Sequence, residues 1–260
     1  MILVKASIQT LWIKVVNFSI LSYNIQAGRN ARDKYDLGRT IKTIKKSQAE
    51  IIGLNEVDRN WSARSNWDDQ PKIISGKFEA SSVFAASLDE PPTKEGRLWR
   101  QFGNLLLCQY PILENKVEKM NIAGTSTVSP GDRRNTETRT LILAKINLWE
   151  VEIWVLCTHL TPHDQQKDRL EQIAKIEKII GILEGPLVLI GDLNASPDCE
   201  ELTRLRKLLN DPSEGKGFVT KPDEGRQIDY ILVRDLKVEE IKVLDSDTSD
   251  HLPIFAKISR

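Results

Sequence analysis

The sequence predicts a single α/β domain, and three observations support this prediction. Apolar runs of five to nine residues recur along the 260-residue chain, and their β-branched content and flanking Gly, Pro or Asn are typical of strands. Helical patterns lie between some of these runs, an alternation typical of α/β folds. No Ser/Gly-rich linker or low-complexity segment divides the chain, so one domain over residues 1–260 is favoured over two small ones.

Eight apolar runs are predicted to be strands. Several of them carry no polar alternation, so we expect these strands to be buried on both faces. In chain order they cover residues 18–25, 50–57, 103–110, 139–146, 151–159, 186–194, 228–233 and 252–258.

Three helices are predicted, and the clearest covers residues 165–185, where Gly185 provides a stop. The others cover residues 36–50 and 198–209. Two segments share the order strand, helix, strand with polar residues at the strand ends, so we predict one supersecondary unit used twice, from Asn24 to Glu56 and from His159 to Asp192. The apolar stripe predicted for the clearest helix consists of Leu170, Ile173, Ile176, Ile179, Ile180 and Leu183.

Charge and cysteine usage limit the functional classes. The chain has 37 basic and 37 acidic residues, so it lacks the global positive field that draws many proteins to nucleic acid, although a local basic patch stays open. Cys108, Cys157 and Cys199 are odd in number and unpatterned, and the first two lie in apolar runs. We therefore predict buried, reduced thiols and a cytoplasmic location.

The amino-terminal segment is apolar in places but does not fit a targeting signal. Lys5 and Lys14 interrupt it, and no small-residue cleavage site follows. We predict no signal peptide, no stable membrane insertion and no obligate protein partner.

Polar residues stand where the predicted strands end, and strand ends in α/β sheets form ligand clefts. Each one alone could be a turn former or a helix cap, but their number and complementary chemistry favour one shared site. These residues are Asn24, Glu56, His159, Asp192, Asn194, Asp229, Asp250 and His251.

The chemistry of this set suits hydrolysis of a phosphate ester. Hard oxygen ligands such as Glu56 and Asp250 favour Mg²⁺ or Mn²⁺. The sequence has no cysteine cluster and no HExxH motif, which argues against thiolate zinc sites and zincins. It also lacks the GxSxG motif of a serine nucleophile.

A series of motifs resembles the endonuclease/exonuclease/phosphatase family over residues 18–258. The resemblance implies a four-layer αββα sandwich of two mixed β-sheets flanked by helices, the DNase I-like fold. It also implies Mg²⁺-dependent hydrolysis of phosphodiesters or phosphomonoesters at the sheet ends, with Mn²⁺ as a substitute. The motifs, in order, are "SYNIQ", "LNEVD", "GNLLLCQYPI", "ETRTLILAKI", "CTHLT", "GDLNASP", "IDYILV" and "SDHLPIFAKI".

The resemblance assigns roles on the metal side. Glu56 is the principal metal ligand, with Asn24 beside it and Asp250 near or on the metal. His251 contacts the scissile phosphate, and Asp229 holds its imidazole. The adjacent Asp250 is not the expected partner of His251, because neighbours on an extended chain point to opposite faces.

Further roles follow from the same motifs. Asp192 orients and deprotonates the attacking water, while Asn194 and His159 bind phosphate oxygens. Arg139 braces the acidic site, or alternatively is a surface arginine on a strand. Gln26 occupies a position where many nuclease members carry an Asp, which weakens a second metal site and mildly disfavours abasic-site nucleases.

The substrate is left open between a small molecule, a lipid headgroup and a nucleic acid. Loops 58–71 and 121–138 are predicted substrate walls. A non-catalytic binding module is disfavoured, because the proposed metal ligand and imidazole are present. A nuclease is the first alternative, because a basic, aromatic rim could bind stacked bases, although its tryptophans could equally pack locally. That rim would consist of Arg59, Arg64, Arg97, Arg100, Arg133 and Arg134 with Trp61, Trp67 and Trp99.

Overall fold

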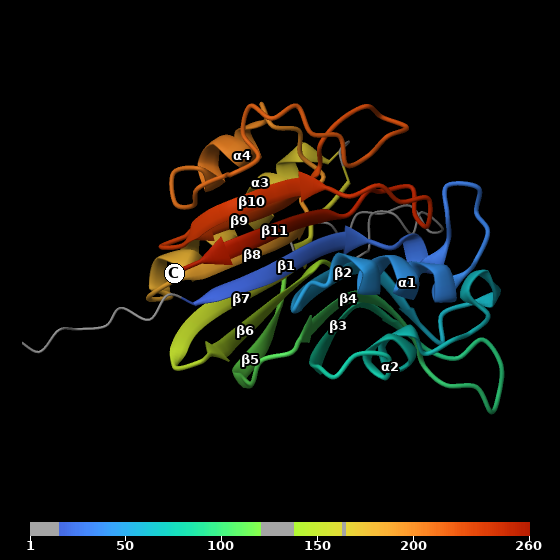
Figure 1. Ribbon diagram of the computed structural model, residues 1–260. Helices are drawn as coiled ribbons and strands as arrows, with labels where there is room; N and C mark the ends of the chain where they lie inside the picture. Colours follow the sequence, from blue (N-terminus) through green and yellow to red (C-terminus); the bar gives the residue numbers. More distant parts are fainter. Residues whose placement is uncertain (1–15, 121–137, 163–164) are drawn as a thin grey trace, which may run out of the picture.

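Two β-sheets packed face to face form the centre of the molecule, and helices cover their outer faces (Figure 1). The structure is a computed structural model that describes residues 16–120, 138–162 and 165–260. Each sheet contains one parallel strand pair among antiparallel pairs, so both sheets are mixed. The predicted four-layer sandwich is confirmed.

The first sheet has six strands in the order β10-β11-β1-β2-β4-β3. Its parallel pair is β1 and β2. Its strands are β1 (Asn17–Asn24), β2 (Ile51–Arg59), β3 (Ser81–Glu90), β4 (Arg100–Cys108), β10 (Lys237–Val243) and β11 (Ile254–Ser259).

The second sheet has five strands in the order β5-β6-β7-β8-β9. Its parallel pair is β7 and β8. Its strands are β5 (Ile112–Lys119), β6 (Thr140–Leu148), β7 (Val151–His159), β8 (Leu187–Asp192) and β9 (Asp229–Arg234).

Helices form the two outer layers. The first α-helix along the chain begins after Asp36, whose side chain caps it by accepting a hydrogen bond from the backbone nitrogen of Arg39. Helices α1 (Leu37–Ser47) and α2 (Gln70–Ser75) cover the first sheet, and α3 (Gln166–Ile182) and α4 (Glu200–Leu205) cover the second. Two short 3₁₀ turns, η1 (Gln26–Gly28) and η2 (Ala63–Ser65), follow β1 and β2.

Three apolar clusters hold the four layers together, one at each interface. The central cluster joins the sheets through residues such as Ile20, Val155 and Val188. At Gly53 the sheets approach so closely that a Cβ atom would lie 2.4 Å from Cδ1 of Ile190. A side chain at this position would therefore displace the side chains of Ile190 and Cys157 from their packed positions in the central cluster.

The eight predicted strands are confirmed, but three others were missed. Strands β3, β5 and β10 lie at sheet edges and carry many exposed polar residues, so no apolar run marks them. The helix predicted at residues 198–209 is shorter, covering only α4. Cys108 and Cys157 are buried free thiols, as predicted, whereas Cys199 is partly exposed.

Helix α3 buries a face that overlaps the predicted one but also includes polar residues. Ile173, Ile176 and Ile180 are buried as expected, but Leu170 is only partly buried. Arg169 and Gln172 are buried instead, because they form hydrogen bonds to Glu201 and to residues of the β7–α3 loop. Hydrophobic periodicity misses polar side chains that are buried by pairing.

The predicted repeated unit is confirmed by the strand register. Both β1–α1–β2 and β7–α3–β8 join two parallel strands through a helix. Asn24 lies beside Asn55 at the end of the first pair, and His159 lies beside Asp192 at the end of the second. Parallel strands end at the same edge, so each unit delivers two polar groups together. Among the described residues, no helix is long and apolar enough to span a membrane.

Candidate active site

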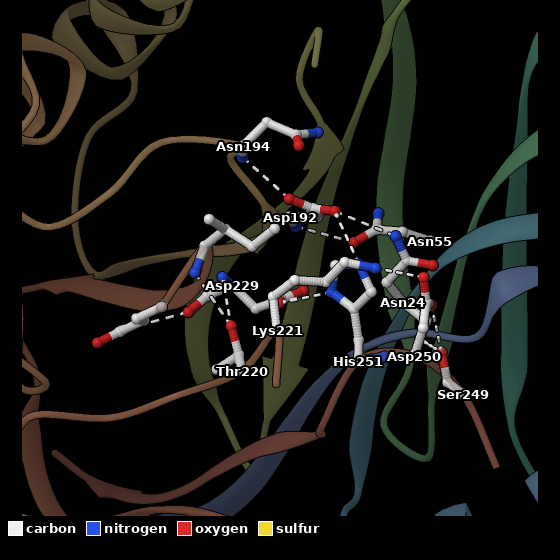
Figure 2. A network of polar contacts seen from close by, with 12 residues as sticks. Asn24, Asn55, Asp192, Asn194, Thr220, Lys221, Asp229, Ser249, Asp250 and His251 are labelled. Atoms are coloured by element: carbon white, nitrogen blue, oxygen red, sulfur yellow. Dashed lines mark hydrogen bonds and ion pairs between the residues drawn. The ribbon is translucent and has the colours of Figure 1, made fainter. Parts of the chain in front are cut away.

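The candidate site lies where the two repeated units end, and residues from both sheets meet there (Figure 2). The loop that precedes β11 adds Asp250 and His251, and the first residue of β9 adds Asp229. The predicted convergence of these strand-end residues is therefore present in the structure.

Asp192 is the centre of the site. One carboxylate oxygen accepts a hydrogen bond from Nδ2 of Asn24 (3.1 Å), and the other accepts one from the backbone nitrogen of Asn194 (2.9 Å). Its side chain is only 2% exposed. Burial and the charge of Asp229 raise the pKa of Asp192 to about 7. This carboxyl group is thus able to exchange a proton near neutral pH.

His251 and Asp229 form the predicted pair. Nδ1 of His251 lies 2.8 Å from Oδ2 of Asp229, which is fully buried. Burial alone would lower the pKa of His251, but the charge of Asp229 and the hydrogen bond to it raise this pKa to about 10. The ring is therefore an imidazolium at neutral pH, and its Nε2 lies 3.8 Å from Oδ2 of Asp192.

His159 has the opposite electrostatic character. Its Nε2 lies 3.4 Å from Oδ2 of Asp192. Burial and the positive charge of Arg139 lower the pKa of His159 well below its ordinary range. The imidazole is therefore neutral, and its contact with Asp192 is not an ion pair. Arg139 is only 4% exposed, so the interpretation as a surface arginine is wrong.

Glu56 occupies an irregular end of β2. The register with β4 shifts between Leu54 and Val57, and Glu56 has a left-handed backbone with φ of 57°. Such bulges and positive φ values concentrate at functional sites, where they redirect a side chain. Oε1 of Glu56 accepts a hydrogen bond from Nδ2 of Asn24 (3.1 Å). The amide nitrogen of Asn24 therefore bridges Glu56 and Asp192.

Asn55 was not singled out in the sequence, yet it joins the two sheets at the site. It is fully buried, and its Nδ2 donates to Oδ1 of Asn104 (2.8 Å) and to the carbonyl oxygen of Thr158 (3.0 Å). Its Oδ1 accepts from the backbone nitrogen of Asp192 (2.9 Å). Its position directly before Glu56 at a strand end was the available signal.

Lys221 was also missed, and it engages Asp250. Its Nζ forms an ion pair with Oδ2 of Asp250, and Oδ1 of Asp223 lies 3.6 Å away. Lys221 is only 8% exposed overall, so it is a buried cation at the edge of the site. Ser249 adds a hydrogen bond to Oδ1 of Asp250 (3.2 Å). The aspartate predicted near the metal is thus already neutralised by a lysine.

Two predicted amides face the backbone. Nδ2 of Asn194 donates to the carbonyl oxygen of Leu160 (3.0 Å), so only its second hydrogen is left for a phosphate oxygen. The backbone nitrogen of Gln26 donates to Oδ1 of Asn24 (3.1 Å). With its amide nitrogen turned toward the loop, Gln26 also donates to the carbonyl oxygens of Arg29 (3.0 Å) and Asn30 (3.1 Å).

The predicted wall at residues 58–71 makes hydrogen bonds within the segment and an aromatic contact with β4. Asp58 is buried and accepts hydrogen bonds from Arg64 (2.7 and 2.9 Å) and Ser65 (2.6 Å). The rings of Trp61 and Phe102 lie 6.0 Å apart. Residues 121–137 of the other predicted wall lie outside the described residues, with Arg133 and Arg134 among them.

The donor set fits a hard divalent cation. The carboxylates of Glu56 and Asp192 meet at the neutral amide of Asn24 rather than at a cation. Within the described part of the chain, Oδ1 of Asp229 is buried without a hydrogen-bond partner. Ligand atoms of Asp192, Asp229 and His251 lie within 4.8 Å of one another. However, a protonated His251 has no lone pair for a metal, so the oxygen donors of Glu56 and Asn24 are the better ligands.

A family sequence model covers the same residues that form the site. Residues 21–251 match the sequence model of the Endonuclease/Exonuclease/phosphatase family. The chain belongs to this family. Members of the endonuclease/exonuclease/phosphatase family are phosphoester hydrolases and are generally dependent on a divalent metal. The chain is accordingly a phosphoester hydrolase.

Individual relatives of this chain have low sequence identity to it. It is 19% identical to a UPF0294 protein of Vibrio campbellii over 95% of this chain and 77% of the relative. A crystal structure of an endonuclease/exonuclease/phosphatase from Beutenbergia cavernae has a TM-score of 0.76 at 18% identity, covering 94% of this chain and 71% of that one. A mannosyl-6-phosphatase of Bacteroides thetaiotaomicron has a TM-score of 0.67 at 16% identity, covering 93% and 99%. At these identities the structures show a shared fold.

Proposed function

We propose that this chain is a Mg²⁺-dependent hydrolase of phosphate esters, with Mn²⁺ as a substitute, in which Asp192 activates the attacking water. The observation that carries this proposal is the pairing of a buried carboxyl group whose pKa is raised to about 7 with the imidazolium of His251. A base with a pKa near the working pH and a nearby proton donor are what general acid–base hydrolysis requires.

Glu56 and Asn24 would hold the metal ion, with Asp250 next to them. When bound, Mg²⁺ would neutralise charge on the phosphate and polarise its oxygens. Asp250 would have to exchange its ion pair with Lys221 to contact the ion directly. The neutral side chain of Gln26 supports one metal ion rather than two at this position.

Asp192 and His251 would carry out the proton transfers, and neighbouring residues would hold them in place. Asn24 and Asn194 hold the two carboxylate oxygens, so the group is oriented before water arrives. Asp192 takes the proton of the attacking water. The Nε2–H of His251 donates to a phosphate oxygen or to the leaving group, while Asp229 keeps the ring charged and oriented.

His159 would stabilise the phosphate as charge develops in the transition state. Because its imidazole is neutral, it contributes one N–H donor rather than a full charge. Burial lowers the pKa of His159, and the positive charge of Arg139 lowers it further, so both maintain the neutral form. The second hydrogen of the Asn194 amide would bind another phosphate oxygen.

The substrate class is supported less directly. One structural relative is described as a mannosyl-6-phosphatase, which supports a small phosphate ester. A nuclease is the alternative, and it is weakened by the arginines that cover Trp61 and Trp67 within the protein. The buried free thiols of Cys108 and Cys157 support a reducing, cytoplasmic compartment.

Turnover of a phosphoester panel tests the proposal. Phosphomonoesters, phosphodiesters and oligonucleotides would be incubated with Mg²⁺, Mn²⁺ or a chelator. We expect turnover with either ion, its loss on chelation, and turnover about 10³-fold slower in an Asp192→Asn variant purified in the same way. If no member of the panel shows divalent-metal-dependent turnover, the proposed function is wrong.

A further inference from the structure

A cleft opens beside the candidate site and shares Gln26 and Asp250 with it. Its volume is about 630 Å³, within the range of about 300–1,000 Å³ typical of small-molecule sites. Gln26, Ser249 and Asp250 line its inner end. Ser249 also donates to the carbonyl oxygen of Asn24 (2.8 Å), and Asp250 precedes His251. An ester substituent of a phosphate bound at His251 would therefore extend into this cleft.

The cleft wall is polar and nearly balanced in charge. Arg32 and Arg39 supply two positive charges, and Asp223, Asp247 and Asp250 supply three negative ones. None of the described residues that line the cleft carries an aromatic ring. The wall thus offers no surface for stacking a base and no positive groove for a polyanion. It offers carboxylate, guanidinium and amide groups that hydrogen-bond to hydroxyls.

Parts of this wall are joined by hydrogen bonds before any ligand binds. Nη2 of Arg39 donates to both carboxylate oxygens of Asp247 (2.8 and 2.7 Å). Oδ1 of Asn30 accepts from the backbone nitrogens of Arg32 and Lys34 (both 3.0 Å). Walls ordered in advance cost less entropy on binding and favour recognition of a defined pattern of hydroxyls.

The β2–α2 and β3–β4 loops have a contrasting character. There Arg64 and Arg100 lie 5.7 and 5.2 Å from the ring of Trp61, and Arg97 lies 4.4 Å from the ring of Trp67. The protein's own cations therefore already cover these two rings. These loops give little support for stacked nucleobases, although Trp99 is 57% exposed.

We propose that the cleft binds an uncharged, polyhydroxylated group esterified to the phosphate, namely a sugar or a cyclitol. This inference rests on the proposed function, because the phosphate must be held at His251, next to the cleft. Arg32 and Asp223 are both exposed on the cleft wall and would bind hydroxyl groups of the ligand.

Relative specificity tests the proposal. The quantity to measure is kcat/KM for hexose 6-phosphates and inositol monophosphate divided by kcat/KM for p-nitrophenyl phosphate, whose leaving group offers no hydroxyls to the wall. We expect Arg32→Ala and Asp223→Ala each to lower this ratio about tenfold, the effect of losing a hydrogen bond to a charged group. Phosphatidylinositol vesicles, as a separate substrate, distinguish a membrane-borne cyclitol from a free one.

Matched controls are Lys178→Ala and Glu184→Ala, which remove one charge each from exposed positions on and after α3. Both should leave the ratio unchanged. The proposal is overturned if the cleft variants behave like these controls, or if nucleotides or oligonucleotides are better substrates than all the polyol esters.

Failure of the proposed function gives a different result. If neither p-nitrophenyl phosphate nor any other member of the phosphoester panel is hydrolysed with any metal, the hydrolase assignment of the site residues fails. Calorimetric titration with hexose 6-phosphate then tests whether the cleft binds the sugar. A Kd about tenfold weaker in Arg32→Ala supports the cleft, whereas an unchanged Kd or no binding by the parent protein overturns it.

Discussion

The two β–α–β units, β1–α1–β2 and β7–α3–β8, have the same topology but end in different chemistry. The first ends at an irregular bulge, where the partly exposed Glu56 is held by Asn24. The second ends in regular register, where His159 and Asp192 are buried. In the proposed function, the partly exposed Glu56 would bind the cation and the buried Asp192 would take the proton of the attacking water.

This comparison teaches that one supersecondary unit can serve two purposes, because strand-end residues carry the chemistry and the remaining strand positions carry the fold. It predicts that damage to the first unit is a metal defect and damage to the second is a proton-transfer defect. The following experiments can break or sharpen this distinction.

The largest effect is expected for Asp192→Asn in the second unit. An amide is close in size to a carboxylate but cannot take a proton from water, so kcat should fall about 10³-fold. Steady-state kinetics at rising Mg²⁺ should show no recovery. Recovery at high metal concentration would place Asp192 on the metal side and remove the proposed distinction.

Glu56→Gln in the first unit should lower activity about 10²-fold at low metal concentration, because one charged ligand is lost. Here raising Mg²⁺ or Mn²⁺ should restore a large part of the activity. Metal titration monitored by calorimetry should show weaker binding than in the parent protein. If binding is unchanged, Glu56 is not the principal ligand.

Asn55→Ala should weaken the connection between the two units. It removes three hydrogen bonds and leaves the buried nitrogen of Asp192 and two buried oxygens without their partner, at a cost of about 3 kcal/mol in the free energy of unfolding. Denaturant unfolding measures this cost. Asn115→Ala on the exposed face of β5 is the control and should change stability by less than about 0.5 kcal/mol.

The last and most gradual effect concerns pH and contrasts the two imidazoles in the metal-free protein. The pKa of His251 is raised to about 10, so its stabilising contribution is complete below 6.5 and is lost as the pH rises toward 10. The slope is about 1.4 kcal/mol per pH unit at most. The pKa of His159 is lowered, so its contribution is lost as the pH falls below 6.5.

NMR titration of the two ring signals checks these directions. We expect the His251 ring to stay protonated at pH 8 and the His159 ring to stay neutral at pH 6. In an Asp229→Asn variant, the pKa of His251 should be lower than in the parent protein. If both rings titrate near 6.5, the assigned electrostatic roles are wrong.

The sequence predicted the centre of the fold better than its periphery. The central strands are long apolar runs because both of their faces are buried, and a simple pattern marks them. Edge strands β3, β5 and β10 expose polar residues to solvent, so their sequences resemble loops. In α3 the buried Arg169 depends on Glu201, a contact that local periodicity does not contain.

The candidate site shows the same division. Residues at the ends of buried strands, such as Asp192, could be placed because an apolar run leads directly to them. Asn55 and Lys221 could not, since their roles depend on contacts with Thr158 and Asp250, which are distant in sequence. The predicted pairing of His251 with Asp229 succeeded because motif order identified both partners.

Strand β11 has a consequence for biosynthesis. It is the last strand in chain order, yet it lies inside the first sheet between β10 and β1, and His251 stands just before it. A nascent chain on the ribosome cannot complete this sheet, nor bring His251 to Asp229, until β11 has emerged from the exit tunnel. Translation products truncated before His251 would therefore be inactive, because they lack both this imidazole and the strand that joins β10 to β1.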